Sequence, residues 1–145
     1  MNLSEITNNP DAVKFWLGLI DLSHTWDDLI DKDKDLSDRA IHEAFWFALC
    51  DLPNNQFYRT YQNYFQPLIV SCCIDFIASV NMERENKRED LSHVLRYSLG
   101  RVINAIALIE KGKDFVMTQS DEVWEMIVDD TFEQYQKERK LCLAS

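Results

Sequence analysis

Residues 9–31 read NPDAVKFWLGLIDLSHTWDDLID, and this stretch decides the fold class. Asn9 is a favourable N-cap, Pro10 suits the first helical position, and Asp11 places an acid beside the positive end of a helix. Beyond them, apolar side chains recur with helical spacing at positions 16, 19, 20, 22, 26, 29 and 30. The sequence therefore predicts an amphipathic helix from Ala12 to about Asp31.

Two more helical patterns follow this helix. Ser37 is expected to cap a second helix through Ala40–Leu49, which stops before Pro53. Because that helix is apolar nearly all round, we expect it to be central. The apolar run Leu68–Val80 predicts a third helix, in which Pro67 either kinks a longer helix or begins a new one.

The C-terminal part of the chain predicts two further helices. One covers Leu91–Glu110, capped by Asp90 and closed by Gly112. The other covers Asp121–Lys140 and is capped by Ser120. Together the patterns predict an all-α protein: one domain over residues 1–145, folded as a compact bundle of five or six helices.

Composition narrows the possible functions. The chain has 145 residues, of which 46% are hydrophobic, with three glycines, three prolines and a net charge of −10. So few turn residues disfavour an all-β fold, and an acidic chain is unsuited to general nucleic-acid binding. The run Leu68–Val80 is too short to span a bilayer, and the N-terminus lacks the features of a signal peptide. The cysteines form no CxxC pair, and we expect a cytoplasmic protein without a disulfide framework.

The acidic residues are concentrated in one segment, DLSHTWDDLIDKDKDLSD at 21–38, which holds seven Asp and two Lys. Asp27, Asp28 and Asp31 are neighbours on a helix, with His24 beside them. Carboxylates so placed repel one another, and a divalent cation would offset that repulsion. We therefore predict a Mg²⁺ or Mn²⁺ site at these aspartates, the alternative being a solvated acidic helix face.

Asp75 and Glu43 are expected to complete that site from other helices. Asp75 is the one charged residue between Leu68 and Val80, where an unpaired carboxylate would be expensive. A bound cation would offset the cost, and so would an ion pair with an arginine such as Arg96 or Arg101. We favour the cation.

A metal so placed would hold and neutralise a phosphate or diphosphate group of a small molecule and activate water for hydrolysis. His24 or His42 would then carry a proton, although a lone histidine such as His42 is more often part of a core. Arg101 would clamp the anion from the polar side of the fourth predicted helix. That side also carries His93, Tyr97 and Asn104, and a solvated face is its alternative reading. The sequence leaves open whether the protein is an enzyme.

Two resemblances bear on this prediction. Asp27-Asp28-Leu29-Ile30-Asp31 has the DDxxD form of class I isoprenoid synthases, whose aspartates hold Mg²⁺ against a substrate diphosphate; the chain is shorter than that family's helical barrel and shows no clear second metal motif. The run HTWDDLIDKDK at 24–34, with the Phe-Trp-rich helix after it, resembles a family of small uncharacterised phage and prophage proteins. That resemblance implies a phage protein acting in the host cytoplasm.

The linker between the first two helices also suggests a calcium loop. Asp31, Asp33, Asp35 and Ser37 match alternate ligand positions of an EF-hand, but Leu36 stands where the loop needs glycine.

A function of another class fits the same residues. The protein would be a non-enzymatic acidic interaction protein, such as a phage-encoded inhibitor or adaptor, whose acids attract a basic host protein. The two functions differ in shape: an enzyme site is expected to be concave with Asp27 partly buried, and an interaction face convex with its acids exposed.

Overall fold

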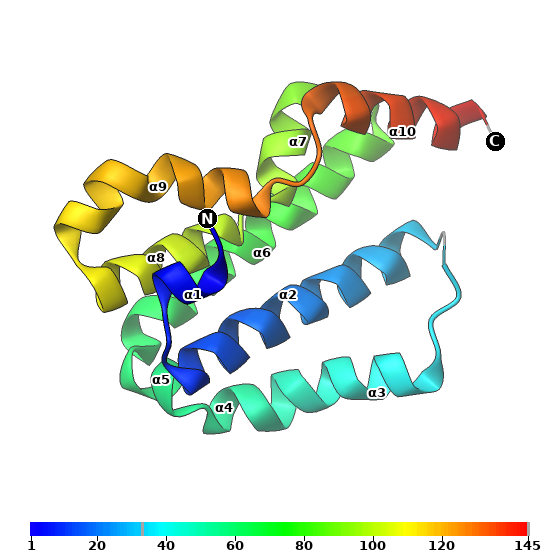
Figure 1. Ribbon diagram of the computed structural model, residues 1–145. Coiled ribbons are helices and arrows are strands. Elements are labelled where there is room, and N and C mark those ends of the chain that lie inside the picture. Colours follow the sequence, from blue (N-terminus) through cyan, green and yellow to red (C-terminus); the bar gives the residue numbers. More distant parts are fainter. Residues whose placement is uncertain (33, 145) are drawn as a thin grey trace. The chain divides into compact units, whose positions relative to one another are not determined.

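The computed structural model describes residues 1–32 and 34–144, and about 83% of these residues are helical, without a strand among them. The all-α prediction is confirmed, but the described residues form eight α-helices of five residues or more instead of five or six. Figure 1 shows the elements in chain order. They are α1 Leu3–Ile6, α2 Pro10–Asp31, α3 Asp38–Trp46, the π-helical turn η1 Phe47–Asp51, α4 Leu52–Asn54, α5 Gln56–Thr60, α6 Gln62–Arg84, α7 Glu89–Arg96, α8 Gly100–Lys111, α9 Lys113–Ile127 and α10 Phe132–Ala144.

Contacts within the chain divide it into two units. The N-terminal unit comprises Leu3–Phe65, and the C-terminal unit comprises residues 1–2 with those from Gln66 onward. That residues 1–145 form a single domain stays a prediction.

The N-terminal unit is built on α2, which begins as the sequence predicts. The Asn9 side chain accepts hydrogen bonds from the backbone N–H groups of Asp11 and Ala12, and Pro10 is the first helical residue. Helix α2 ends at Asp31, where Lys32 adopts a left-handed conformation with φ 56°. Helix α3 returns antiparallel to α2 (Figure 1), and its cap is Ser37, as predicted.

Aromatic side chains fill the interior of the N-terminal unit. The ring of Phe15 on α2 lies 4.9 Å from that of Phe65 and 5.5 Å from that of Tyr58. The Asn55 side chain caps α5 and also donates a hydrogen bond of 2.8 Å to the Asp11 backbone oxygen. This bond fixes the start of α5 against the start of α2.

The second helix neither ends before Pro53 nor lies at the centre, which corrects two predictions. It continues from α3 through η1 into α4, and Pro53 is in the second position of α4. In a regular α-helix the Pro53 ring would clash with the carbonyl four residues earlier, and the wider turn of η1 lies at this place. The Asn54 side chain donates to the Cys50 oxygen, which satisfies one carbonyl of the turn. Phe45, Trp46 and Leu49 are exposed.

In the C-terminal unit the predicted fourth and fifth helices are each split in two. Residues 97–99 separate α7 from α8, and a break at residues 128–131 separates α9 from α10. Ser120 lies inside α9, so it is not the cap that we predicted. The cap of α10 is Thr131, whose hydroxyl accepts from the Gln134 N–H while the Gln134 side chain accepts from the Thr131 N–H.

Helices α8 and α9 lie side by side and are joined at Gly112, whose φ of 88° favours glycine (Figure 1). Gly100 of α8 makes room for Trp124 of α9, because an added Cβ would stand 2.3 Å from a ring carbon of Trp124. The buried side chains of this pair include Val102, Ile103, Ile106 and Val123. Packing of small and large residues therefore holds the pair together.

Helix α6 is unusual because it is apolar although only three of its residues, Phe65, Cys72 and Ser79, are buried. Among the described residues it is the one helix with the length and composition of a membrane-spanning segment, with a mean hydropathy of 1.5 in its most apolar window, which is 17% buried. The prediction that residues 68–80 are too short to span a bilayer concerned the apolar run alone; α6 has 23 residues and includes Pro67. Core helices of soluble proteins meet the same criterion, so this finding assigns no location.

Candidate functional site

The three aspartates of the predicted metal site lie in the last turns of α2. Asp28 is 3.9 Å from the Lys34 ammonium and is mostly buried, whereas Asp27 is half-buried and Asp31 exposed. Within residues 1–32 and 34–144, no group of three or more His, Cys, Asp or Glu side chains is placed to hold a metal ion. The metal site stays a prediction, and titration of Mn²⁺ into the wild type and an Asp27→Asn/Asp31→Asn variant tests it. Of the calcium-loop residues, Asp33 lies outside the described part of the chain.

Asp75 belongs to the C-terminal unit and has protein partners there. Its Oδ2 lies 2.9 Å from Arg101 Nη1 and accepts a hydrogen bond of 2.5 Å from the Ser98 hydroxyl. This is the ion-pair alternative, with Arg101 as the arginine. Because Arg101 is about half exposed, solvent screens the pair, and the hydrogen bond from buried Ser98 adds to it. The role of Arg101 as an anion clamp stays a prediction.

In α7, the polar side of the predicted fourth helix is not the side exposed to solvent, contrary to expectation. His93 is 8% exposed, while its apolar neighbour Val94 is 65% exposed. His93 stacks on Tyr135 with ring centroids 4.9 Å apart, and its Nε2 lies 3.0 Å from Asp130 Oδ1. The segment before α10 thus supplies a carboxylate partner and α10 itself an aromatic one, and these contacts favour burial of the imidazole over burial of the aliphatic chain.

This histidine is part of a buried polar network in the C-terminal unit. Tyr97 donates hydrogen bonds to Asp129 and Asp130, and burial together with these bonds raises the pKa of Tyr97 well above its ordinary value. Burial opposes charge on Asp130, but hydrogen bonds from Tyr97 and His93 outweigh it and hold the pKa of that carboxyl below its usual range.

The second half of the network centres on Tyr135. Its hydroxyl is 2.9 Å from Ser92 Oγ and donates to Glu83 Oε1 at 2.7 Å. Arg139 donates to the Glu83 backbone oxygen at 2.9 Å and lies beside the Tyr135 ring. These hydrogen bonds connect α6, α7 and α10, so the network serves the packing of these helices.

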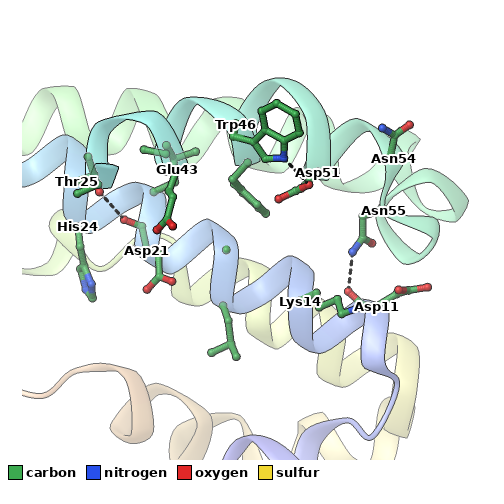
Figure 2. Close-up of a pocket in the computed structure, with 16 residues that line it drawn as sticks. Asp11, Lys14, Asp21, His24, Thr25, Glu43, Trp46, Asp51, Asn54 and Asn55 are labelled. Atoms are coloured by element: carbon green, nitrogen blue, oxygen red, sulfur yellow. Dashed lines mark hydrogen bonds between the residues drawn. The ribbon is translucent and has the colours of Figure 1, made fainter. Parts of the chain in front are cut away.

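The candidate functional site is a groove in the N-terminal unit, with a volume of about 1000 Å³ between α2 and the α3–η1–α4 segment. We call it the α2–α3 groove; Figure 2 shows its lining. Among the predicted site residues, His24 and Glu43 line it, whereas His42 is exposed on α3 and does not. The lining residues are Asp11, Lys14, Leu17, Gly18, Asp21, Leu22, His24, Thr25, Ala40, Glu43, Ala44, Trp46, Phe47, Asp51, Asn54 and Asn55.

Local packing explains how the groove forms. Phe47, the first residue of η1, lies against Gly18 of α2, where a Cβ would stand 2.1 Å from a ring carbon. Only a glycine at position 18 leaves room for that ring, so the two helices meet there. The Trp46 side chain, one residue earlier, is 63% exposed at the rim, and its Nε1 donates a hydrogen bond of 3.2 Å to Asp51 (Figure 2).

The charge of the groove is strongly negative. Asp11, Asp21, Glu43 and Asp51 line it against one lysine, Lys14. Glu43 pairs with Arg39 at 2.8 Å, but both side chains are largely exposed, so solvent screens the pair. The groove thus offers exposed carboxylates around an apolar floor.

No protein-family model, curated protein or solved structure matches this chain.

Sequence reasoning missed the apolar half of this site. Two apolar side chains of the lining are exposed to solvent, Leu17 by 49% and Trp46 by 63%. Pro53 was one available signal for this wall of the groove. A proline within a helical pattern favours either the end of the helix or a local distortion such as η1.

Proposed function

We propose that this protein is a binding protein that recognises a basic segment of another protein through the α2–α3 groove. The observation that carries the proposal is the lining itself, in which four carboxylates lie around apolar residues together with the exposed Trp46 side chain. The sequence suggests the same class of function as an alternative, an acidic interaction protein. The proposed binding surface is now the α2–α3 groove and not the face that carries Asp27, Asp28 and Asp31. The groove is concave, as expected for an enzyme, yet its acids at positions 21, 43 and 51 are exposed and Asp27 is not in its lining.

Electrostatics support a basic partner. The chain carries a net charge of −10, and a groove lined by one sign of charge raises the local concentration of oppositely charged ligands. Such complementarity increases the association rate and excludes acidic competitors. Nucleic acids, which are polyanions, are repelled by the same field.

Exposed apolar side chains would supply the affinity. Trp46 and Leu17 line the groove and are 63% and 49% exposed, and large aromatic side chains dominate the energetics of protein interfaces. An arginine of the partner that lies over the Trp46 ring would also gain a cation–π contact. A phage-encoded inhibitor or adaptor of a host protein, the alternative that the sequence suggests, would use these same residues.

The test is to map the binding of a basic ligand by NMR, with hexa-arginine added to ¹⁵N-labelled protein. We expect amide shifts to concentrate on groove residues, and an Asp21→Asn/Glu43→Gln variant to weaken binding by about tenfold, which corresponds to about 1.4 kcal/mol. The matched control is Glu122→Gln/Glu125→Gln, which changes the net charge equally at two exposed sites on α9. Equal weakening by both variants, or shifts spread over all acidic surfaces, would contradict a specific site.

A further inference from the structure

We infer that the segment bound in the α2–α3 groove is an amphipathic basic helix of about four turns; this inference rests on the proposed function. The first observation is the direction of the groove. Its lining on α2 extends from Asp11 to Thr25, and on the other wall from Asn55 back to Ala40. The groove therefore follows the axes of two antiparallel helices over about 21 Å, at about 1.5 Å per residue.

The volume of the groove agrees with a helix lying in it. A helix with side chains is about 10–12 Å wide, so a segment about 21 Å long occupies about 2000 Å³. Half of that segment, sunk between the two walls, would displace about 1000 Å³, which is the volume that the groove offers. A bound helix of about 14 residues would thus be half-buried and half-exposed.

Backbone hydrogen bonding favours a helix over an extended segment. The walls of the groove are α2, α3, η1 and α4, whose backbone N–H and C=O groups bond within their own helices. An extended segment obtains its affinity from backbone bonds to a sheet edge, and among the described residues there is no strand to supply one. A helix satisfies its own backbone groups and needs only side-chain contacts.

The lining also specifies the pattern of side chains on the partner. Asp11 lines the groove at the start of α2, and Asp21 lies ten residues further along the same helix. Ten residues correspond to about 15 Å, or almost three helical turns. The partner helix would thus carry two basic positions about three turns apart, with apolar residues between them against Leu17 and Phe47.

The experiment compares three ligands on the full-length protein by fluorescence anisotropy. One is a labelled basic amphipathic peptide of about 14 residues with this pattern. The second is the same peptide with two central apolar residues replaced by proline, so that its charge is unchanged, and the third is hexa-arginine. We expect the first to bind at least about tenfold more tightly than the second and to gain helical circular dichroism on binding. If the first two bind equally, the helical inference is overturned while the proposed function stands. If none of the three ligands binds, both fail.

A pair of variants places the peptide in the groove. Leu17→Lys puts a positive charge on the floor, and we expect it to weaken peptide binding by about tenfold or more. Leu108→Lys makes the same change on α8, at a side chain of similar exposure, and is expected to leave binding unchanged. Both residues are more than 40% exposed, so neither change should unfold the protein. Peptide affinity unaffected by Leu17→Lys would overturn the inference.

Discussion

Replacing Tyr135 by phenylalanine removes one hydroxyl from the buried network of the C-terminal unit. The side chain is 1% exposed, and its hydroxyl donates a 2.7 Å hydrogen bond to the Glu83 carboxylate. The ring remains stacked on His93, so the change is confined to polar contacts. Hydrogen bonds to charged groups contribute about 1.5–3 kcal/mol. We therefore expect Tyr135→Phe to lower the free energy of unfolding by that amount at neutral pH and Tm by about 3–12 °C.

The size of this loss should depend on pH. Burial and the neighbouring Glu83 carboxylate raise the pKa of Tyr135 from 10 to about 12. Because folding favours the neutral phenol, its stabilisation is fully present below pH 10, the pKa in the unfolded chain, and is lost as the pH rises toward 12. Between these values the loss is about 1.4 kcal/mol per pH unit. The stability difference between wild type and Tyr135→Phe should therefore shrink above pH 10.

Urea unfolding of both proteins, followed by circular dichroism between about pH 7 and pH 11, measures this difference. Tyr97 also titrates at high pH, but both proteins retain it, so its effect cancels in the comparison. A difference that stays constant or grows as the pH rises from about 9 to 11 would refute the argument. So would a variant as stable as the wild type at neutral pH.

Three further variants test the packing and the caps. Gly18→Ala should destabilise the N-terminal unit by about 1–2 kcal/mol, since overpacking against Phe47 exceeds the gain in helix propensity of about 1 kcal/mol; thermal melts would show the loss. Asp75→Asn should lower Tm by a few degrees through loss of the Arg101 pair, and a variant that melts at or above the wild-type temperature would contradict a stabilising pair and favour the predicted site role of Asp75. Thr131→Ala should cost about 1 kcal/mol and accelerate hydrogen exchange in the first turn of α10, whereas unchanged exchange would show that this cap is dispensable.

Local signals were sufficient for α2 and for the start of α3. The caps at Asn9 and Ser37, and the helix start at Pro10, involve only residues within three positions of each. The local sequence is therefore enough to predict them. The same reasoning placed a cap at Ser120 and overlooked Thr131-x-x-Gln134, which is an equally local pattern. The capping signal was present in the sequence, but it was overlooked because one long helix was predicted across it.

What the sequence by itself determined is the helical class, the two N-terminal caps and the need to compensate the charge of Asp75. What only the tertiary structure decided is which partner compensates each group. Asp75 of α6 pairs with Arg101 of α8 and accepts a hydrogen bond from Ser98, which precedes α8. His93 contacts Asp130 and Tyr135. These contacts join distant segments, so they depend on where the helices turn. The groove has the same origin: Gly18 and Phe47 are 29 positions apart, and only the return of α3 along α2 brings the ring to the glycine. Helical periodicity reports which residues share a face, but the choice of the face that is buried depends on the neighbouring helix.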